Sequence, residues 1–114
     1  MGAIDFTALE LVQGQLKAYN NHDIEDFCRF FSNDIQCFDA RTQQVLIEGI
    51  DEFRQRYTQV FANPQLVCHL QNRIQMGNII IDHELVEGRS AEPLQAIAIY
   101  HIENDKITKV HFYT

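Results

Sequence analysis

Residues 66–87 read LVCHLQNRIQMGNIIIDHELVE, two extended segments that meet at Gly77-Asn78. A two-residue turn with glycine suits an antiparallel hairpin, because glycine tolerates a positive φ angle. Residues 94–103 and 106–113 repeat this arrangement around Asn104-Asp105. The second half of the chain therefore predicts two β-hairpins and no helix.

The first half of the chain carries helical signals. Thr7 and Glu10 have the spacing of a capping box, and apolar residues then recur at steps of three and four. Asp23 is placed to cap a second helix, which should end before the turn residues 32–34. A third helix should end at Asn63-Pro64. The expected apolar stripes are Leu9, Val12, Leu16 and Tyr19, then Ile24, Phe27, Cys28 and Phe31, then Ile50, Phe53, Tyr57, Val60 and Phe61.

Two short strands are expected between the second and third helices. The first is Ile35-Gln36-Cys37-Phe38-Asp39 and the second covers residues 45–47. The order is then helix, helix, strand, strand, helix and four strands, which predicts an α+β domain with a mainly antiparallel sheet. A chain of 114 residues is long enough for one core, so we expect a single domain over residues 1–114.

Composition and motifs argue against several classes of protein. A net charge of −7 without a basic cluster opposes binding to nucleic acid or anionic membranes. No stretch approaches the ~18 apolar residues of a membrane span, and the N-terminus does not resemble a secretory signal. Three cysteines among apolar neighbours are typical of buried thiols in a cytoplasmic protein. The dispersed histidines lack ligand spacing and no phosphate loop is present, so we expect neither a metal nor a cofactor.

The segment Leu94–Tyr100 is apolar on both alternating faces. A half-exposed antiparallel strand would instead alternate, so something must cover each face. Helices can cover one face, and the other is covered either by a second copy of the chain or by a sheet that curls on itself. We expect the second copy, which predicts a homodimer through the outer sheet face. Candidate contact residues are Ile97, Ile99, His101, His111 and Tyr113.

Several local strings carry a resemblance to a known group of proteins. They are Val12…Ala18-Tyr19-Asn20-Asn21-His22-Asp23, Phe31-Ser32-Asn33-Asp34, Gly49…Phe53-Arg54…Tyr57 and Lys106-Ile107…Val110. These strings, and the element order, resemble the ketosteroid isomerase and SnoaL-like branch of the nuclear transport factor two-like superfamily. The resemblance implies a cystatin-like α+β roll, in which three helices and a curved sheet form a cone around an apolar pocket. It also implies a small apolar or carbonyl-containing ligand.

The resemblance places Asp39 where ketosteroid isomerases carry their general base. Those enzymes stabilise the enolate oxygen with a tyrosine and a protonated aspartic acid. The corresponding residues here are Gln15 and Ala98. Gln15 offers only a neutral hydrogen bond and Ala98 offers none, so steroid isomerase activity itself is not expected.

Two interpretations of Asp39 stay open. It is either a base at the mouth of an apolar pocket, or a solvated carboxylate in the turn before Arg41 of a non-catalytic binding or dimerisation module. In the first case Tyr100, Gln15 or Tyr19 would orient a carbonyl oxygen during isomerisation, cyclisation or dehydration. The expected pocket residues are Phe31, Phe53, Tyr57, Ala98, Val110, Phe112, Asp82 and Glu84.

The last two of these belong to a polar cluster. Counting from the Gly77-Asn78 turn pairs Met76 with Ile79, Arg73 with Asp82, Gln71 with Glu84 and His69 with Val86. This register puts His69, Gln71, Arg73, Asp82 and Glu84 on one sheet face. That face is either a polar strip lining the pocket, with Asp82 or Glu84 as a second acid or base, or a solvent-facing ladder of ion pairs. Alternating long charged side chains favour the ladder.

Overall fold

The computed structural model describes residues 6–114 as three helices and a six-stranded sheet. The helices are α1 (Phe6–Asn20), α2 (Ile24–Cys28) and α3 (Ile50–Phe61), and the strands are β1 (Phe31–Asp39), β2 (Val45–Glu48), β3 (Val67–Met76), β4 (Ile79–Glu87), β5 (Leu94–Glu103) and β6 (Lys106–Tyr113). The strand order is β2-β1-β6-β5-β4-β3, and every pair is antiparallel except β1 with β6. The predicted α+β class with a mainly antiparallel sheet is confirmed.

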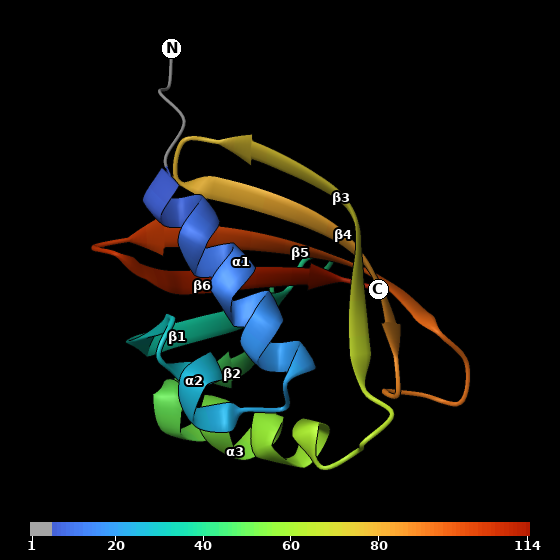
Figure 1. Cartoon of the computed structure of the whole chain (residues 1–114). Coiled ribbons are helices and arrows are strands. Elements are labelled where there is room, and N and C mark those ends of the chain that lie inside the picture. Colours follow the sequence, from blue (N-terminus) through green and yellow to red (C-terminus); the bar gives the residue numbers. More distant parts are fainter. Residues whose placement is uncertain (1–5) are drawn as a thin grey trace.

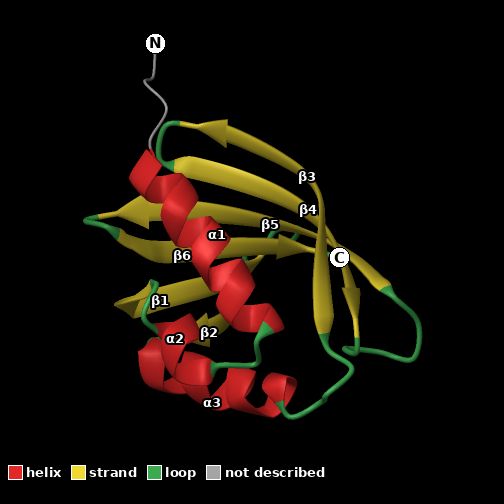
Figure 2. Cartoon of the chain, in the orientation of Figure 1, coloured by secondary structure: helices red, strands yellow, loops and turns green. Residues whose placement is uncertain are grey.

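The sheet curves around the helices and forms the predicted cone (Figure 1). Helix α1 lies across the concave face, whereas α2 and α3 pack near β1 and β2 (Figure 2). Strand β4 buries every second side chain, Ile80, Asp82, Glu84 and Val86, on the face toward the helices. Any cavity between the helices and the sheet is therefore lined by this face.

Aromatic packing fixes α2 and α3 against the start of β1. The Phe27 and Phe53 rings stack with centroids 5.4 Å apart, and Phe31 lies 4.4 Å from Phe53. Asp23 caps α2 as predicted, because its side chain accepts a hydrogen bond of 3.1 Å from the Asp26 amide.

Both hairpins form at the predicted turns. Gly77, Asn104 and Asp105 have φ angles of 59°, 50° and 63°, the left-handed conformation that tight hairpin turns require. All three cysteines are buried, as predicted. Within residues 6–114, no helix is long and apolar enough to cross a membrane.

Two predictions in the first half of the chain are wrong. Thr7 lies inside α1 and is not its cap. Phe31 begins β1, and residues 32–34 belong to that strand rather than to a turn. The backbone of Phe31 pairs with Ile107 of β6, and the register then shifts before Gln36. An irregularity within the strand therefore accommodates the polar residues that resemble a turn.

The pairing of β3 with β4 follows the prediction only near the turn. Arg73 faces Asp82 as predicted, but a register shift next to Leu70 makes Glu84 face Leu70 rather than Gln71. A β-bulge of this kind adds one residue to a strand and changes which face the residues beyond it occupy. The predicted single face with five polar residues is therefore broken.

The same bulge affects His69, which pairs with Leu85 rather than Val86. His69 is exposed and its Nε2 lies 2.9 Å from a carboxylate oxygen of Glu87. In contrast, Asp82 is 0% exposed and Glu84 is 7% exposed. The solvent-facing ladder is wrong for these two carboxylates, which point into the cone.

Candidate functional site

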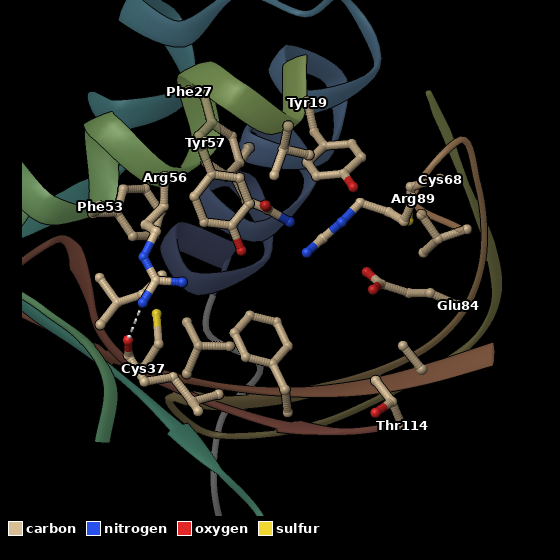
Figure 3. Close-up of a pocket in the computed structure, with 18 of the residues that line it drawn as sticks. Tyr19, Phe27, Cys37, Phe53, Arg56, Tyr57, Cys68, Glu84, Arg89 and Thr114 are labelled. Atoms are coloured by element: carbon tan, nitrogen blue, oxygen red, sulfur yellow. Dashed lines mark hydrogen bonds between the residues drawn. The ribbon is translucent and has the colours of Figure 1, made fainter. Parts of the chain in front are cut away.

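A cavity of about 580 Å³ lies between the helices and the concave face of the sheet. Sites for small molecules are commonly clefts of roughly 300–1,000 Å³ with mainly apolar walls. Figure 3 shows polar groups entering this space from several elements. Its apolar wall includes Phe27, Phe31, Phe53, Val86, Val110 and Phe112.

Most of the predicted site residues meet at this cavity. They are Gln15, Tyr19, Phe31, Asp39, Phe53, Tyr57, Glu84, Tyr100, Val110 and Phe112. Ala98 and Asp82 were expected in the pocket wall but do not line the cavity. Both are fully buried, and they pair with each other across β4 and β5.

Asp82 is enclosed by an ion pair with Arg73. The Arg73 Nε and Nη2 atoms donate to the two carboxylate oxygens at 2.7 and 2.9 Å, and Nη1 donates to Gln13 at 2.8 Å. The hydrogen bonds to Asp82 raise the pKa of Arg73. This bidentate arrangement uses both oxygens of Asp82, which indicates a structural role.

Asp39 lies at the cavity edge, at the end of β1. Its Oδ1 accepts hydrogen bonds from the backbone amides of Arg41 at 2.8 Å and Thr42 at 3.1 Å. Aspartate often stabilises a turn in this way. The geometry supports the turn interpretation, and the catalytic role of Asp39 stays a prediction.

Glu84 is a buried carboxyl group that faces the cavity (Figure 3). Burial, reinforced by the nearby charge of Asp82, raises its pKa from 4.5 to about 7. A hydrogen bond with the Cys68 thiol and the charge of Arg73 oppose this shift. Near neutral pH the group is therefore poised both to accept and to donate a proton.

Three tyrosine side chains line the same cavity. Tyr19 and Tyr57 extend from α1 and α3 with their hydroxyls toward the open space (Figure 3), and Tyr100 comes from β5. Burial raises the pKa of Tyr19 to about 12 and the pKa values of Tyr57 and Tyr100 well above 10. All three are therefore neutral phenols at pH 7, able to donate hydrogen bonds.

Gln15 is held by its neighbours. Its Nε2 donates to the Val12 carbonyl at 3.0 Å and to the Tyr100 hydroxyl at 3.2 Å. Both amide hydrogens are thus engaged, whereas the Tyr100 hydroxyl keeps its own hydrogen for another acceptor. Of the predicted carbonyl-orienting residues, Tyr100 and Tyr19 are better placed to donate than Gln15.

Two arginines that the sequence patterns did not single out also line the cavity. Arg89 extends into the space beside Tyr19, whereas Arg56 lies on the other side and donates to the Leu46 carbonyl at 3.1 Å (Figure 3). The hydrogen bond and positive charge of Arg89 partly oppose the rise in the Tyr19 pKa. The only sequence signal for Arg89 is its place directly after a glycine at a strand end.

That glycine fixes the backbone before Arg89. Gly88 has a φ angle of 92°, and a Cβ atom there would lie 2.6 Å from the Leu66 Cα. The Gly88 carbonyl accepts a hydrogen bond of 2.7 Å from the Asn63 side chain. Only glycine fits this close approach without strain, and the contact determines where the chain leaves β4.

Comparisons with known proteins agree with this fold. No curated protein matches the chain. Similar solved structures include an uncharacterised cystatin-fold protein from Novosphingobium aromaticivorans, with 25% identity, 94% of this chain and 97% of that chain covered, and a TM-score of 0.86. A candidate polyketide cyclase from Sinorhizobium meliloti has 15% identity, coverages of 91% and 94%, and a TM-score of 0.76.

A third similar structure is a protein with a ketosteroid isomerase-like fold from Catenulispora acidiphila, in complex with trimethylamine. It has 12% identity, coverages of 92% and 85%, and a TM-score of 0.72. The model of the SnoaL-like domain matches residues 12–110. The chain therefore belongs to the SnoaL-like domain family and has the nuclear transport factor two-like fold that its sequence resembles.

Proposed function

We propose that this protein binds a small molecule with an apolar body and a polar, oxygen-bearing end, and that Glu84 exchanges a proton with it. The observation that carries this proposal is a buried carboxyl group with a pKa of about 7 in a mainly apolar cavity. Proton transfer is most efficient when the pKa of the catalytic group lies near the working pH. The hydroxyls of Tyr19, Tyr57 and Tyr100 supply neutral donors for a developing oxyanion.

Isomerisation, cyclisation or dehydration next to a carbonyl would all use this set of groups. Each begins with removal of a proton from a carbon beside the carbonyl, which a buried carboxylate accepts. Each also builds negative charge on the carbonyl oxygen, which the tyrosines would stabilise. Asp39 is the competing base, because the family resemblance assigns it that role.

Exchange of carbon-bound hydrogen for deuterium tests this function without a known substrate. The protein is incubated in D₂O with a panel of small cyclic and aromatic ketones, and loss of the proton beside the carbonyl is followed by NMR. We expect faster exchange for at least one ketone, and a loss on the order of 100-fold or more in Glu84→Gln, the usual range for a general base. Asp39→Asn should retain the rate within about threefold.

A large loss of exchange in Asp39→Asn, with the rate retained in Glu84→Gln, would identify Asp39 as the base instead. If the protein accelerates no exchange but still binds ketones, a second function is favoured, the non-catalytic binding of an apolar ligand in the same cavity. The observation that supports this alternative is that Gln15 has both amide hydrogens engaged. The family resemblance also puts Ala98, which cannot donate, at the position of an oxyanion donor.

We also infer that two copies associate through the outer face of the sheet. On that face, residues paired across neighbouring strands form a mostly apolar row. The row consists of Ile74, Ile81, Ile99, His111 and Phe38. Desolvation lowers the pKa values of His101 and His111, so both are mainly neutral at pH 7. A continuous apolar face of this kind is typical of a protein–protein contact, and a twofold axis would let it pair with itself.

Ile99→Asp should convert the homodimer into a monomer. Ile99 lies in the middle of the row, and a carboxylate there would be buried without a partner in the dimer. Sedimentation at micromolar concentration should give twice the mass of one chain for the wild type and one chain for the variant. Ser90→Asp, in the exposed loop after β4, is the matched control. A wild-type mass of one chain would reject the dimer.

The remaining proposals concern environment and partners. The net charge of −7 disfavours nucleic acid and anionic membrane surfaces as partners. The three buried cysteines are unpaired, which suits a reducing compartment. We therefore place the protein in the cytoplasm, with a small molecule as its ligand.

A further inference from the structure

We propose that Arg89 selects an organic carboxylate as the ligand of this cavity, with the Tyr19 hydroxyl as a second donor to the same group. This inference rests on the proposed binding function and adds the charge of the ligand. It concerns the mouth of the cavity, where the chain leaves β4.

Four charged side chains line the cavity, and their partners differ. Asp39 accepts two backbone amides, Arg56 donates to the Leu46 carbonyl, and Glu84 interacts with the Cys68 thiol. Arg89 hydrogen-bonds the Tyr19 hydroxyl, which itself faces the cavity, and among residues 6–114 no carboxylate forms an ion pair with its guanidinium. Its guanidinium projects into the cavity beside Tyr19 (Figure 3).

A guanidinium in this position matches a carboxylate better than other polar groups. Its planar fork of donors binds both carboxylate oxygens at once, whereas a ketone oxygen accepts fewer of them. Tyr19 lies next to this fork and remains a neutral donor at pH 7. The close approach of Gly88 to Leu66 constrains the backbone from which the Arg89 side chain extends.

The aromatic rings in the cavity wall indicate the shape and polarity of the rest of the ligand. Phe31 and Phe53 lie on one side, and Phe112 and Val110 come from β6. Such a wall favours a flat cyclic or aromatic body over a flexible polar one. The inferred ligand class is therefore a cyclic or aromatic monocarboxylic acid.

Glu84 is the cavity group whose negative charge would repel an anionic ligand, so its protonation state matters for binding. An ionised Glu84 repels a carboxylate, whereas a protonated Glu84 can donate to it. An anionic ligand should therefore be bound together with a proton, and toward it Glu84 is a proton donor, whereas toward a neutral ketone it is the base. The groups around Glu84 that influence this step are Cys68 and Arg73 of β3, Asp82 of β4, Tyr100 of β5, Tyr19 of α1, Tyr57 of α3 and Arg89.

Three probes with one aromatic body separate charge from shape. They are 2-naphthoate, the neutral 2-acetylnaphthalene and the cationic (2-naphthylmethyl)trimethylammonium, each titrated calorimetrically at pH 7. We expect the wild type to bind the naphthoate at least tenfold more tightly than the ketone. Arg89→Gln should abolish this preference, because the affinity for the naphthoate falls at least tenfold more than the affinity for the ketone. Arg29→Gln, an exposed arginine outside the cavity, removes the same charge and should keep the preference.

Proton uptake gives a second measurement of the same inference. Naphthoate binding in buffers of different ionisation enthalpy should show uptake of a fraction of a proton at pH 7, because burial raises the pKa of Glu84 to about 7. Glu84→Gln should bind the naphthoate without this uptake.

The outcomes also separate this inference from the function on which it rests. Binding of the ketone without a preference for the naphthoate would overturn the role of Arg89 and leave the proposed cavity function standing. A preference for the cation, or a preference for the naphthoate that survives in Arg89→Gln, would overturn the inference as well. Failure of all three probes to bind would overturn both proposals.

Discussion

Arg73→Met is expected to lower the free energy of unfolding by about 3–5 kcal/mol, because it leaves a buried carboxylate without its partner. Asp82 is 0% exposed, and the Arg73 side chain, 15% exposed, holds both of its oxygens at 2.7 and 2.9 Å. Methionine keeps most of the apolar contact of the arginine stem but supplies no donor. Urea unfolding at pH 7 gives the free-energy difference.

Two further variants show whether the burial of Asp82 causes this loss. The double variant Arg73→Met with Asp82→Leu removes both partners. It should recover most of the lost unfolding free energy, since no unpaired charge is then buried. Arg54→Met, which breaks the exposed pair of Arg54 with Glu25, should cost less than about 1 kcal/mol. Equal losses for Arg73→Met and Arg54→Met would contradict the buried-pair explanation.

Glu84→Gln should become more stable, relative to the wild type, as the pH rises from 4.5 to 7. The pKa of Glu84 is raised from 4.5 to about 7, so the folded protein favours the protonated carboxyl group. The stability that this group contributes is complete below pH 4.5 and is lost as the pH rises through the folded pKa. Glutamine does not ionise, so the variant avoids a loss on the order of 3 kcal/mol.

Unfolding curves at pH 4.5 and pH 8 measure this effect. The free energy of unfolding of Glu84→Gln minus that of the wild type should increase from pH 4.5 to pH 8, whatever its value at pH 4.5. Glu103→Gln, at an exposed position at the end of β5, should show no comparable change. If this difference in unfolding free energy is the same at both pH values, Glu84 titrates in the folded protein as it does in the unfolded chain.

Local patterns predict much of this fold. The turns at Gly77-Asn78 and Asn104-Asp105 form as expected, because their residues accept left-handed φ angles. The alternation along β5 also holds, with Ala98 and Tyr100 toward the helices and Ile97 and Ile99 outward. Both features depend on neighbouring residues alone, so a single sequence is enough to predict them.

The candidate site is less predictable, because contacts between distant segments build it. The bulge next to Leu70 moves Gln71 and His69 away from the buried carboxylates, and no local pattern marks its position. Glu84 looks like a surface residue in sequence, and only the helices packed over β4 bury it and raise its pKa. Arg89 lines the cavity and follows Gly88, whose close approach to Leu66 appears only in the folded chain.

Asp39 shows the same division between sequence and structure. The strand that it ends and the family resemblance follow from the sequence, which left open whether Asp39 lies at a pocket or in a solvated turn. Its place at the cavity edge comes from the structure. Its hydrogen bonds to the amides of Arg41 and Thr42 appear only in the folded chain. The sequence by itself determined most elements and their order, because these depend on local periodicity and turn chemistry, and its local strings carried the family resemblance. Only the tertiary structure decided which carboxyl group is buried, since desolvation depends on every segment that packs around it.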